Sequence, residues 1–105
     1  MDFIVVYVTA PQEELASKIA KTLVEQRLAA CVNIVRNIRS IYHWEGKIED
    51  DQEVLMIIKT TKGCIEDLIR VVKAHHSYTV PEIIALPIIE GSKDYLDWLR
   101  DTVKA

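Results

Sequence analysis

The sequence has little glycine and little cysteine, and both shortages exclude classes of functional site. Three glycines in 105 residues do not supply the glycine-rich loops that cradle phosphates, and no P-loop, GxGxxG or GxSxG motif occurs. The two cysteines, Cys31 and Cys64, lie far apart without CxxC spacing, which indicates neither a zinc ribbon nor a disulfide framework. A D-x-D-x-D-G calcium loop is also missing. We therefore expect no phosphate-cradling loop and no zinc or calcium motif of these types.

Long apolar runs and an excess of positive charge are also missing. No apolar run approaches the ~20 residues that span a bilayer, and the N-terminus lacks the basic and apolar regions of a secretory signal. The net charge of −3 argues against a nucleic-acid binder, which needs a basic face to neutralise phosphates. We expect a cytoplasmic protein with reduced thiols, and neither a membrane nor a nucleic acid as partner.

What the sequence does contain is typical of one small globular domain. Half of the residues are hydrophobic and 28% are charged. A chain of 105 residues is long enough for one core, and no linker or low-complexity segment divides it. We expect a single domain over residues 1–105.

Hydrophobic periodicity predicts four strands and three helices. Pro11 suits a first helical position, Pro81 ends the second helix, and Ser92 is expected to cap the last one. The predicted order is β-α-β-β-α-β plus a terminal helix, an α+β, ferredoxin-like arrangement with one antiparallel sheet. Strands are expected at 3–9, 31–44, 47–60 and 82–89, and helices at 11–27, at 62–76 and after 92.

The composition of the strands predicts that a second subunit covers one face of the sheet. Three of them are apolar at every position, as in strands that are buried on both faces, yet this arrangement places both main helices on one face. The last helix is too short to cover the other face alone. We therefore expect a tight oligomer built sheet against sheet. Residues 38–52 of the long hairpin are expected to project and reach a neighbouring subunit.

Two interpretations of the adjacent His75 and His76 stay open. Neutral imidazole suits copper, zinc or nickel. However, neighbouring helical residues point about 100° apart, and no third or fourth ligand lies nearby in the sequence. The alternative is structural: one histidine caps the end of the second helix, and the other packs or bonds to a backbone carbonyl.

The hairpin turn and the cysteines allow similar alternatives. Residues 42–47, YHWEGK, predict either a pocket with an aromatic wall or a hairpin tip that docks on a neighbouring subunit. Cys31 is expected to pack as a small hydrophobic side chain, with a metal contact as the alternative. Cys64, at a helix start, is expected to be exposed and more reactive. The acidic residues 48–53 are interpreted as a solvated flank of the hairpin.

Five blocks together resemble the CutA divalent-cation tolerance family. The resemblance covers essentially the whole chain and implies a ferredoxin-like homotrimer, similar to the trimers of PII-type signalling proteins. It also implies a link to tolerance of copper and other divalent metals, and no enzymatic activity. The blocks are RLAACVNI (27–34), YHWEGKIE (42–49), EVLMIIKT (53–60), HSYTVPEIIALPI (76–88) and YLDWL (95–99).

The family pattern maps onto particular residues of this chain, with departures. The commoner form of the fourth block reads His-Pro-Tyr-Glu, whereas Ser77 and Thr79 stand here, which removes a carboxylate from any metal site at that point. At His43 the family often carries an aromatic residue. The matched positions are Cys31, Asn33, Trp44, Glu45, Gly46, Lys47, Glu53, Lys59, His76, Tyr78, Pro81 and Trp98.

These positions support two binding hypotheses and a third, lower-ranked one. The leading hypothesis is a cytoplasmic homotrimer that binds Cu(II) or another divalent metal weakly through His76, helped by Cys31 or by a carboxylate, Glu45 or Glu53. The second is a PII-like signalling or scaffold trimer that binds a small anionic effector between subunits. Its anchors would be Lys47 and Lys59, and its walls Trp44, Tyr78 and Trp98. An enzyme using Tyr78 or His76 ranks last, because nothing positions a nucleophile.

Overall fold

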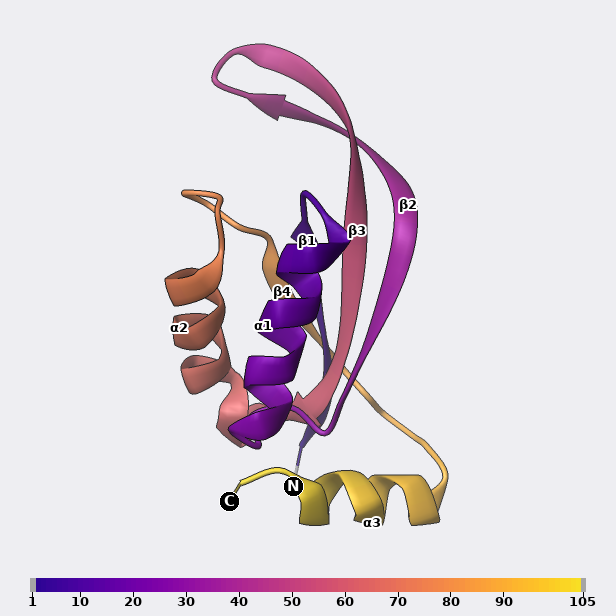
Figure 1. Ribbon diagram of the computed structural model, residues 1–105. Coiled ribbons are helices and arrows are strands. Elements are labelled where there is room, and N and C mark those ends of the chain that lie inside the picture. The colour runs from indigo at the N-terminus through magenta and orange to yellow at the C-terminus, as the bar shows by residue number, and fades with distance from the viewer. Residues whose placement is uncertain (1, 105) are drawn as a thin grey trace.

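The computed structural model describes residues 2–104 and contains one four-stranded antiparallel sheet in the order β2-β3-β1-β4. Helices α1 and α2 cover one face of this sheet, and α3 lies at the end opposite the hairpin tip (Figure 1). The predicted α+β, ferredoxin-like order is confirmed. The elements are β1 (Phe3–Ala10), α1 (Glu13–Glu25), β2 (Cys31–Trp44), β3 (Lys47–Thr61), the 3-10 turn η1 (Lys62–Cys64), α2 (Ile65–His75), β4 (Ile83–Pro87) and α3 (Lys93–Thr102).

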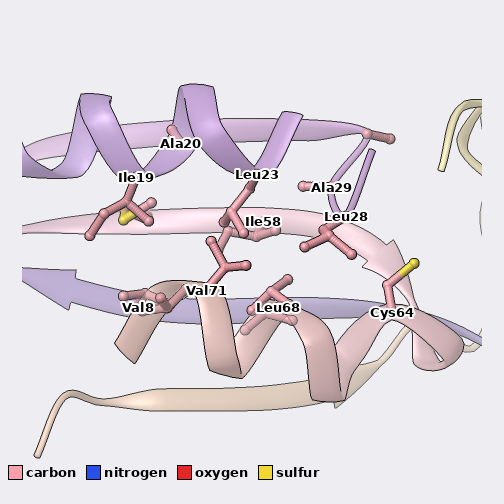
Figure 2. Packing of buried hydrophobic residues seen from close by; sticks show 14 of the residues in the cluster. Val8, Ile19, Ala20, Leu23, Leu28, Ala29, Ile58, Cys64, Leu68 and Val71 are labelled. Atoms are coloured by element: carbon pink, nitrogen blue, oxygen red, sulfur yellow. The ribbon is translucent and has the colours of Figure 1, made fainter. Parts of the chain in front are cut away.

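The core lies between the sheet and the two helices. Along β1 every second residue is buried, because alternate side chains of a strand point to the same face. Figure 2 shows Val8 and Ile58 of the sheet beneath Ile19 and Leu23 of α1, with Leu68 of α2 beside them. Full burial of each such side chain contributes about 1.5–3 kcal/mol relative to exposure, so this layer is the main source of stability in the chain.

The opposite face of the sheet is only partly covered within one chain. Val5 and Ile57 of the central strands are half-buried, and Val35, Ile84 and Leu86 of the two edge strands are exposed. This agrees with the expectation that the chain's own main helices cover only one face of the sheet and leave the other in need of a cover. The cover of that face by another subunit stays a prediction.

Helix α1 ends in a turn that also holds α3. Arg27 adopts φ 59°, the left-handed conformation that often follows a helix. The amide of Arg27 donates to the carbonyl of Val24 at 3.0 Å, and that of Leu28 donates to Leu23 at 2.9 Å. The side chain of Arg27 donates from Nε to the carbonyl of Thr102 at 2.9 Å. One residue thus ends α1 and also satisfies a carbonyl at the end of α3.

Two expectations at helix starts are wrong. Cys64 is 2% exposed and belongs to the core, where its thiol lies 3.5 Å from the carbonyl of Lys104 and 3.6 Å from the hydroxyl of Thr61. It is not the exposed thiol that its position in the sequence suggested. Ser92 does occupy the cap position of α3, but its side chain makes no capping hydrogen bond within residues 2–104.

The β2–β3 hairpin extends well beyond the rest of the molecule (Figure 1), whose principal extents are 44 × 25 × 21 Å. Its two-residue turn, Glu45-Gly46, has φ 51° and 77°, as in the tight turns that favour glycine at the second position. The strand pairing shifts between Val35 and Ile38, where Asn37 has φ 60°. We call residues 38–53, beyond this bulge, the arm. The arm projects as predicted, and its contact with a neighbouring subunit stays a prediction.

The α-helices are all short. Among residues 2–104, none is long and apolar enough to cross a membrane.

Candidate functional site

A large cavity lies between the arm and the connection from α2 to β4. Its volume is about 760 Å³. We call it the arm pocket. Figure 1 shows the arm and this connection at the same end of the molecule. The lining comprises residues 39–42, Trp44 and Glu53 from the arm, residues 77–80 and Glu82 from the connection, and Thr9 from the end of β1.

His76 stands at the start of the connection with both ring nitrogens engaged. Its Nε2–H donates to the carbonyl of Thr9 at 2.8 Å, and its Nδ1 accepts the backbone N–H of Tyr78 at 3.0 Å. These two bonds define the neutral tautomer that carries its proton on Nε2. Neither nitrogen offers a lone pair to a metal ion unless one of the bonds is broken.

His75 differs from its neighbour. It is the last residue of α2, and its Nδ1–H donates to the carbonyl of Val71 at 2.9 Å. This confirms the interpretation of one histidine as a helix cap. The other nitrogen of His75 makes no hydrogen bond within residues 2–104, so the exposed His75 has a free lone pair and His76 has none.

Tyr78 links the connection to the base of the arm. Its hydroxyl donates to Oε2 of Glu53 at 2.6 Å, and its ring centroid lies 4.7 Å from that of His76. Burial and this hydrogen bond raise the pKa of Tyr78 above its ordinary value. Glu53 is only 6% exposed and stands opposite Ile38, where the arm begins. The contact therefore fixes where the arm leaves the body of the domain.

Polar pairs within the arm hold its two strands together. Arg39 donates to both carboxylate oxygens of Asp50, at 2.9 and 2.6 Å, and this lowers the pKa of Asp50. Tyr42 donates to Asp51 at 2.8 Å, which raises the pKa of Tyr42 to about 12. Asp50 and Asp51 of the acidic flank are solvent-exposed, as expected, and each has a specific partner on the opposite strand, whereas the expectation of a solvated flank is wrong for the buried Glu53.

A second cluster lies beside α3, at the other end of the sheet. Cys31 pairs in register with Lys59, whose ammonium lies 3.9 Å from the thiol and donates to the amide oxygen of Asn33. Burial, and after it the neighbouring Cys31, raise the pKa of Tyr95 on α3. Trp98 packs against Tyr95 with ring centroids 5.4 Å apart. Cys31, Lys59 and Trp98 thus belong to this region and not to the arm pocket.

The four predicted metal ligands occupy three separate places in one chain. Cys31 lies near α3, Glu45 lies in the turn at the hairpin tip, and His76 and Glu53 flank Tyr78. Within residues 2–104, no three side chains of His, Cys, Asp or Glu are grouped so that they could hold an ion. A single chain therefore does not assemble the predicted metal site, and the assignment of these ligands stays a prediction.

The predicted ligand-cleft residues divide in the same way. Trp44 and Tyr78 line the arm pocket. Lys47 lies at the hairpin tip, opposite Trp44, whereas Lys59 lies far along β3 beside Cys31. The two lysines that were expected to anchor an anion therefore do not converge within one chain.

The family model described as CutA1 divalent ion tolerance protein matches residues 4–102. The chain belongs to this family. Among its relatives, the divalent-cation tolerance protein CutA of Thermus thermophilus is 59% identical over 97 residues, which are 92% of this chain and 94% of that protein. Human protein CutA is 48% identical over 99 residues, which are 94% of this chain and 55% of the human protein. The resemblance inferred from the five sequence blocks is confirmed.

Solved structures of CutA1 family members have the same fold. The structure of the Thermus thermophilus protein superposes with a TM-score of 0.95 at 56% identity, covering 97% of this chain and 99% of that one. The Oryza sativa CutA1 structure superposes with a TM-score of 0.96 at 48% identity, covering 99% of this chain and 95% of that one. The long hairpin and the placement of α3 are therefore family features and not peculiarities of this sequence.

Sequence reasoning missed part of the arm pocket. Arg39 and Glu82 line it but were not proposed as site residues. Tyr42 and Trp44 belong to the aromatic wall that residues 42–47 predicted: they are two residues apart, so a strand places both aromatic rings on the same face. The contribution of Glu82 had no comparable signal, because the connection that carries it has no periodicity.

Proposed function

We propose that the chain acts as a cytoplasmic homotrimer in the tolerance of divalent metal ions, copper among them, and that it binds such ions weakly. The observation that carries this proposal is its membership of the CutA1 divalent ion tolerance family over residues 4–102. The proposal is a binding function and not a catalytic one.

The surface of the single chain supports assembly. The sheet face opposite α1 and α2 leaves Val35, Ile84 and Leu86 exposed, and on the arm Ile41 and Ile48 are 62% and 71% exposed. A group of large apolar side chains exposed in this way is typical of a surface that another subunit covers. The trimeric state itself rests on the family resemblance. Light scattering of the purified protein tests it: a mass of three chains is expected, and a monomer at micromolar concentration contradicts it.

Weak metal binding is consistent with the geometry of the candidate ligands. Imidazole and thiolate favour copper over magnesium or calcium, so His76 and Cys31 remain the proposed ligands, with Glu45 or Glu53 as carboxylate partners. These residues are separated in one chain, so a shared ion requires ligands from neighbouring subunits. His76 must also give up one of its two hydrogen bonds, which costs free energy and lowers the affinity.

Calorimetric titration with copper tests the ligand assignment. Wild type is compared with His76→Ala and Cys31→Ala, and both variants are expected to bind more weakly. His75→Ala is the matched control, because His75 is adjacent and has a free ring nitrogen. Equal affinity in wild type and the first two variants removes His76 and Cys31 from the site. A loss confined to His75→Ala assigns binding to the helix end.

The second candidate is a PII-like trimer that binds a small anionic effector at the subunit clefts. Its support is the size of the arm pocket, which lies in the usual range for small-molecule sites, and the aromatic side chains of Trp44 and Tyr78 in its lining. The proposed anchors Lys47 and Lys59 would have to approach each other across subunits. A thermal-shift screen of anionic metabolites in EDTA tests this candidate, because ligand binding raises the melting temperature independently of metal. A screen without a shift contradicts it.

A further inference from the structure

The charge of the arm pocket is opposite to what an anionic ligand requires. Two carboxylates line it, Glu53 and Glu82, and Arg39 is the one cationic residue among the described residues of the lining. The guanidinium of Arg39 is already engaged by both oxygens of Asp50. The pocket therefore presents a net negative environment, and a cationic group would be attracted into it.

Glu53 is the feature that most requires a cation. It is 6% exposed, and its one hydrogen-bond donor within residues 2–104 is the hydroxyl of Tyr78. It forms no ion pair in that part of the chain. A carboxylate offers about four acceptor positions, and burial of a charge is costly unless the charge is paired. A donor with positive charge would complete the bonding of Glu53.

Aromatic side chains surround the same space. Tyr42, Trp44 and Tyr78 line the pocket, and Tyr42 and Trp44 keep more than a third of their surface exposed. A cation over an aromatic face gains about 0.5–1 kcal/mol at an exposed site and more when it is desolvated. The hydroxyls of Ser77 and Thr79 add acceptors on the connection side.

We propose that the arm pocket binds a small organic cation, an ammonium or guanidinium group carried on an apolar body. The charged group bonds to Glu53, with Glu82 as the outer carboxylate, and the apolar body packs on Trp44 and Tyr42. The volume of about 760 Å³ lies within the range that encloses such molecules. This inference requires no metal ion, although Glu53 is also one of the proposed metal ligands, and it assigns the pocket a ligand of the opposite charge to the anionic effector.

Calorimetry with three probes of matched shape tests the charge class. The probes are 2-phenylethylammonium, phenylguanidinium and the anion 3-phenylpropionate, each titrated into the assembled protein with EDTA present. We expect both cations to bind with a dissociation constant of about 1 mM or below, and the anion to bind at least about tenfold more weakly. Equal or tighter binding of the anion overturns the proposal, and so does the absence of binding by both cations.

Three variants locate the site. Glu53→Gln keeps an oxygen that accepts from Tyr78 and is expected to weaken cation binding roughly tenfold, because a bond to a charged group is lost. Glu82→Gln changes an exposed side chain, so folding is preserved, and a smaller loss is expected. Glu66→Gln is the control, since Glu66 is exposed on α2 outside the lining. Unchanged affinity in both Glu53→Gln and Glu82→Gln overturns the assignment.

A lysine of a second copy of the chain could supply the same chemistry. Lys47 at the hairpin tip is the candidate, because the arm projects furthest from the rest of its own chain (Figure 1). The titrations are repeated on Lys47→Met. Cation binding in wild type supports the small-molecule proposal. Binding that appears only in Lys47→Met shows that a subunit's own lysine fills the pocket, and this overturns the proposal.

Discussion

Strand β3 consists of two halves with different surroundings. From Val54 to Thr61 it lies beneath the helices, and alternate residues such as Met56 and Ile58 are fully buried. From Lys47 to Gln52 it belongs to the arm, where Ile48 is exposed and the strands are joined by polar pairs such as Arg39 with Asp50. The inner half is stabilised by its own chain. The outer half has almost no core, so its apolar side chains need a partner from elsewhere.

The largest expected effect is the loss of a core side chain from the inner half. Ile58→Ala is expected to lower the free energy of unfolding by about 2–5 kcal/mol, because a cavity replaces the buried side chain. The comparison is Ile48→Ala on the arm. If no other subunit contacts the arm, this variant is expected to change the free energy of unfolding by no more than about 0.5 kcal/mol. Urea unfolding at one fixed protein concentration measures both. A large effect of Ile48→Ala contradicts a free arm and indicates that a neighbouring subunit covers it.

A smaller effect is expected where the two halves meet. Tyr78→Phe removes the donor to the buried Glu53 and is expected to cost about 1–3 kcal/mol of stability. Tyr42→Phe removes the corresponding bond to Asp51 on the exposed arm, where water replaces the lost donor. Unfolding curves of the two variants are compared. Equal effects would show that Glu53 is solvated in solution and that its bond to Tyr78 does not anchor the arm.

The smallest expected effect is a loss of stability at high pH. The folded pKa of Tyr42 is raised from 10.0 to about 12, and that of Tyr78 is raised as well. At a pH between the unfolded and the folded pKa, the unfolded chain has lost the phenolic proton while the folded chain still holds it. Stability therefore falls as the pH rises from about 10 toward 12. Melting temperatures across this range should fall less steeply in Tyr42→Phe and Tyr78→Phe. Identical slopes in both variants and wild type contradict the raised pKa values.

Sequence patterns predicted the elements well because they depend on local chemistry. The continuous apolar run at residues 3–9, the proline at Pro81 and the turn at Gly46 each define an element from a few neighbouring residues. The burial of Cys64 was missed because the segment after α3 that covers it lies about 40 residues further along the chain. The apolar strands indicated that both faces of the sheet need a cover, and the predicted element order indicated that the chain's own main helices cover only one of them.

The candidate site was predictable in its composition but not in its geometry. The family blocks led to Trp44, Glu53, His76 and Tyr78, which do gather around or beside the arm pocket. They could not show that both nitrogens of His76 are occupied, because the tautomer depends on Thr9, 67 residues earlier in the chain. A motif identifies residue types, whereas the availability of a lone pair depends on contacts formed after folding.

The bond from Arg27 to Thr102 has a consequence for biosynthesis. The two residues are 75 positions apart, so the guanidinium is made well before its acceptor. At about 5–20 residues per second, Arg27 waits on the order of several seconds for Thr102 to be added. Helix α1 can pack against its neighbours during that time, but the turn that ends it gains this bond only after α3 has left the exit tunnel. The order of synthesis therefore makes this bond one of the later contacts to form.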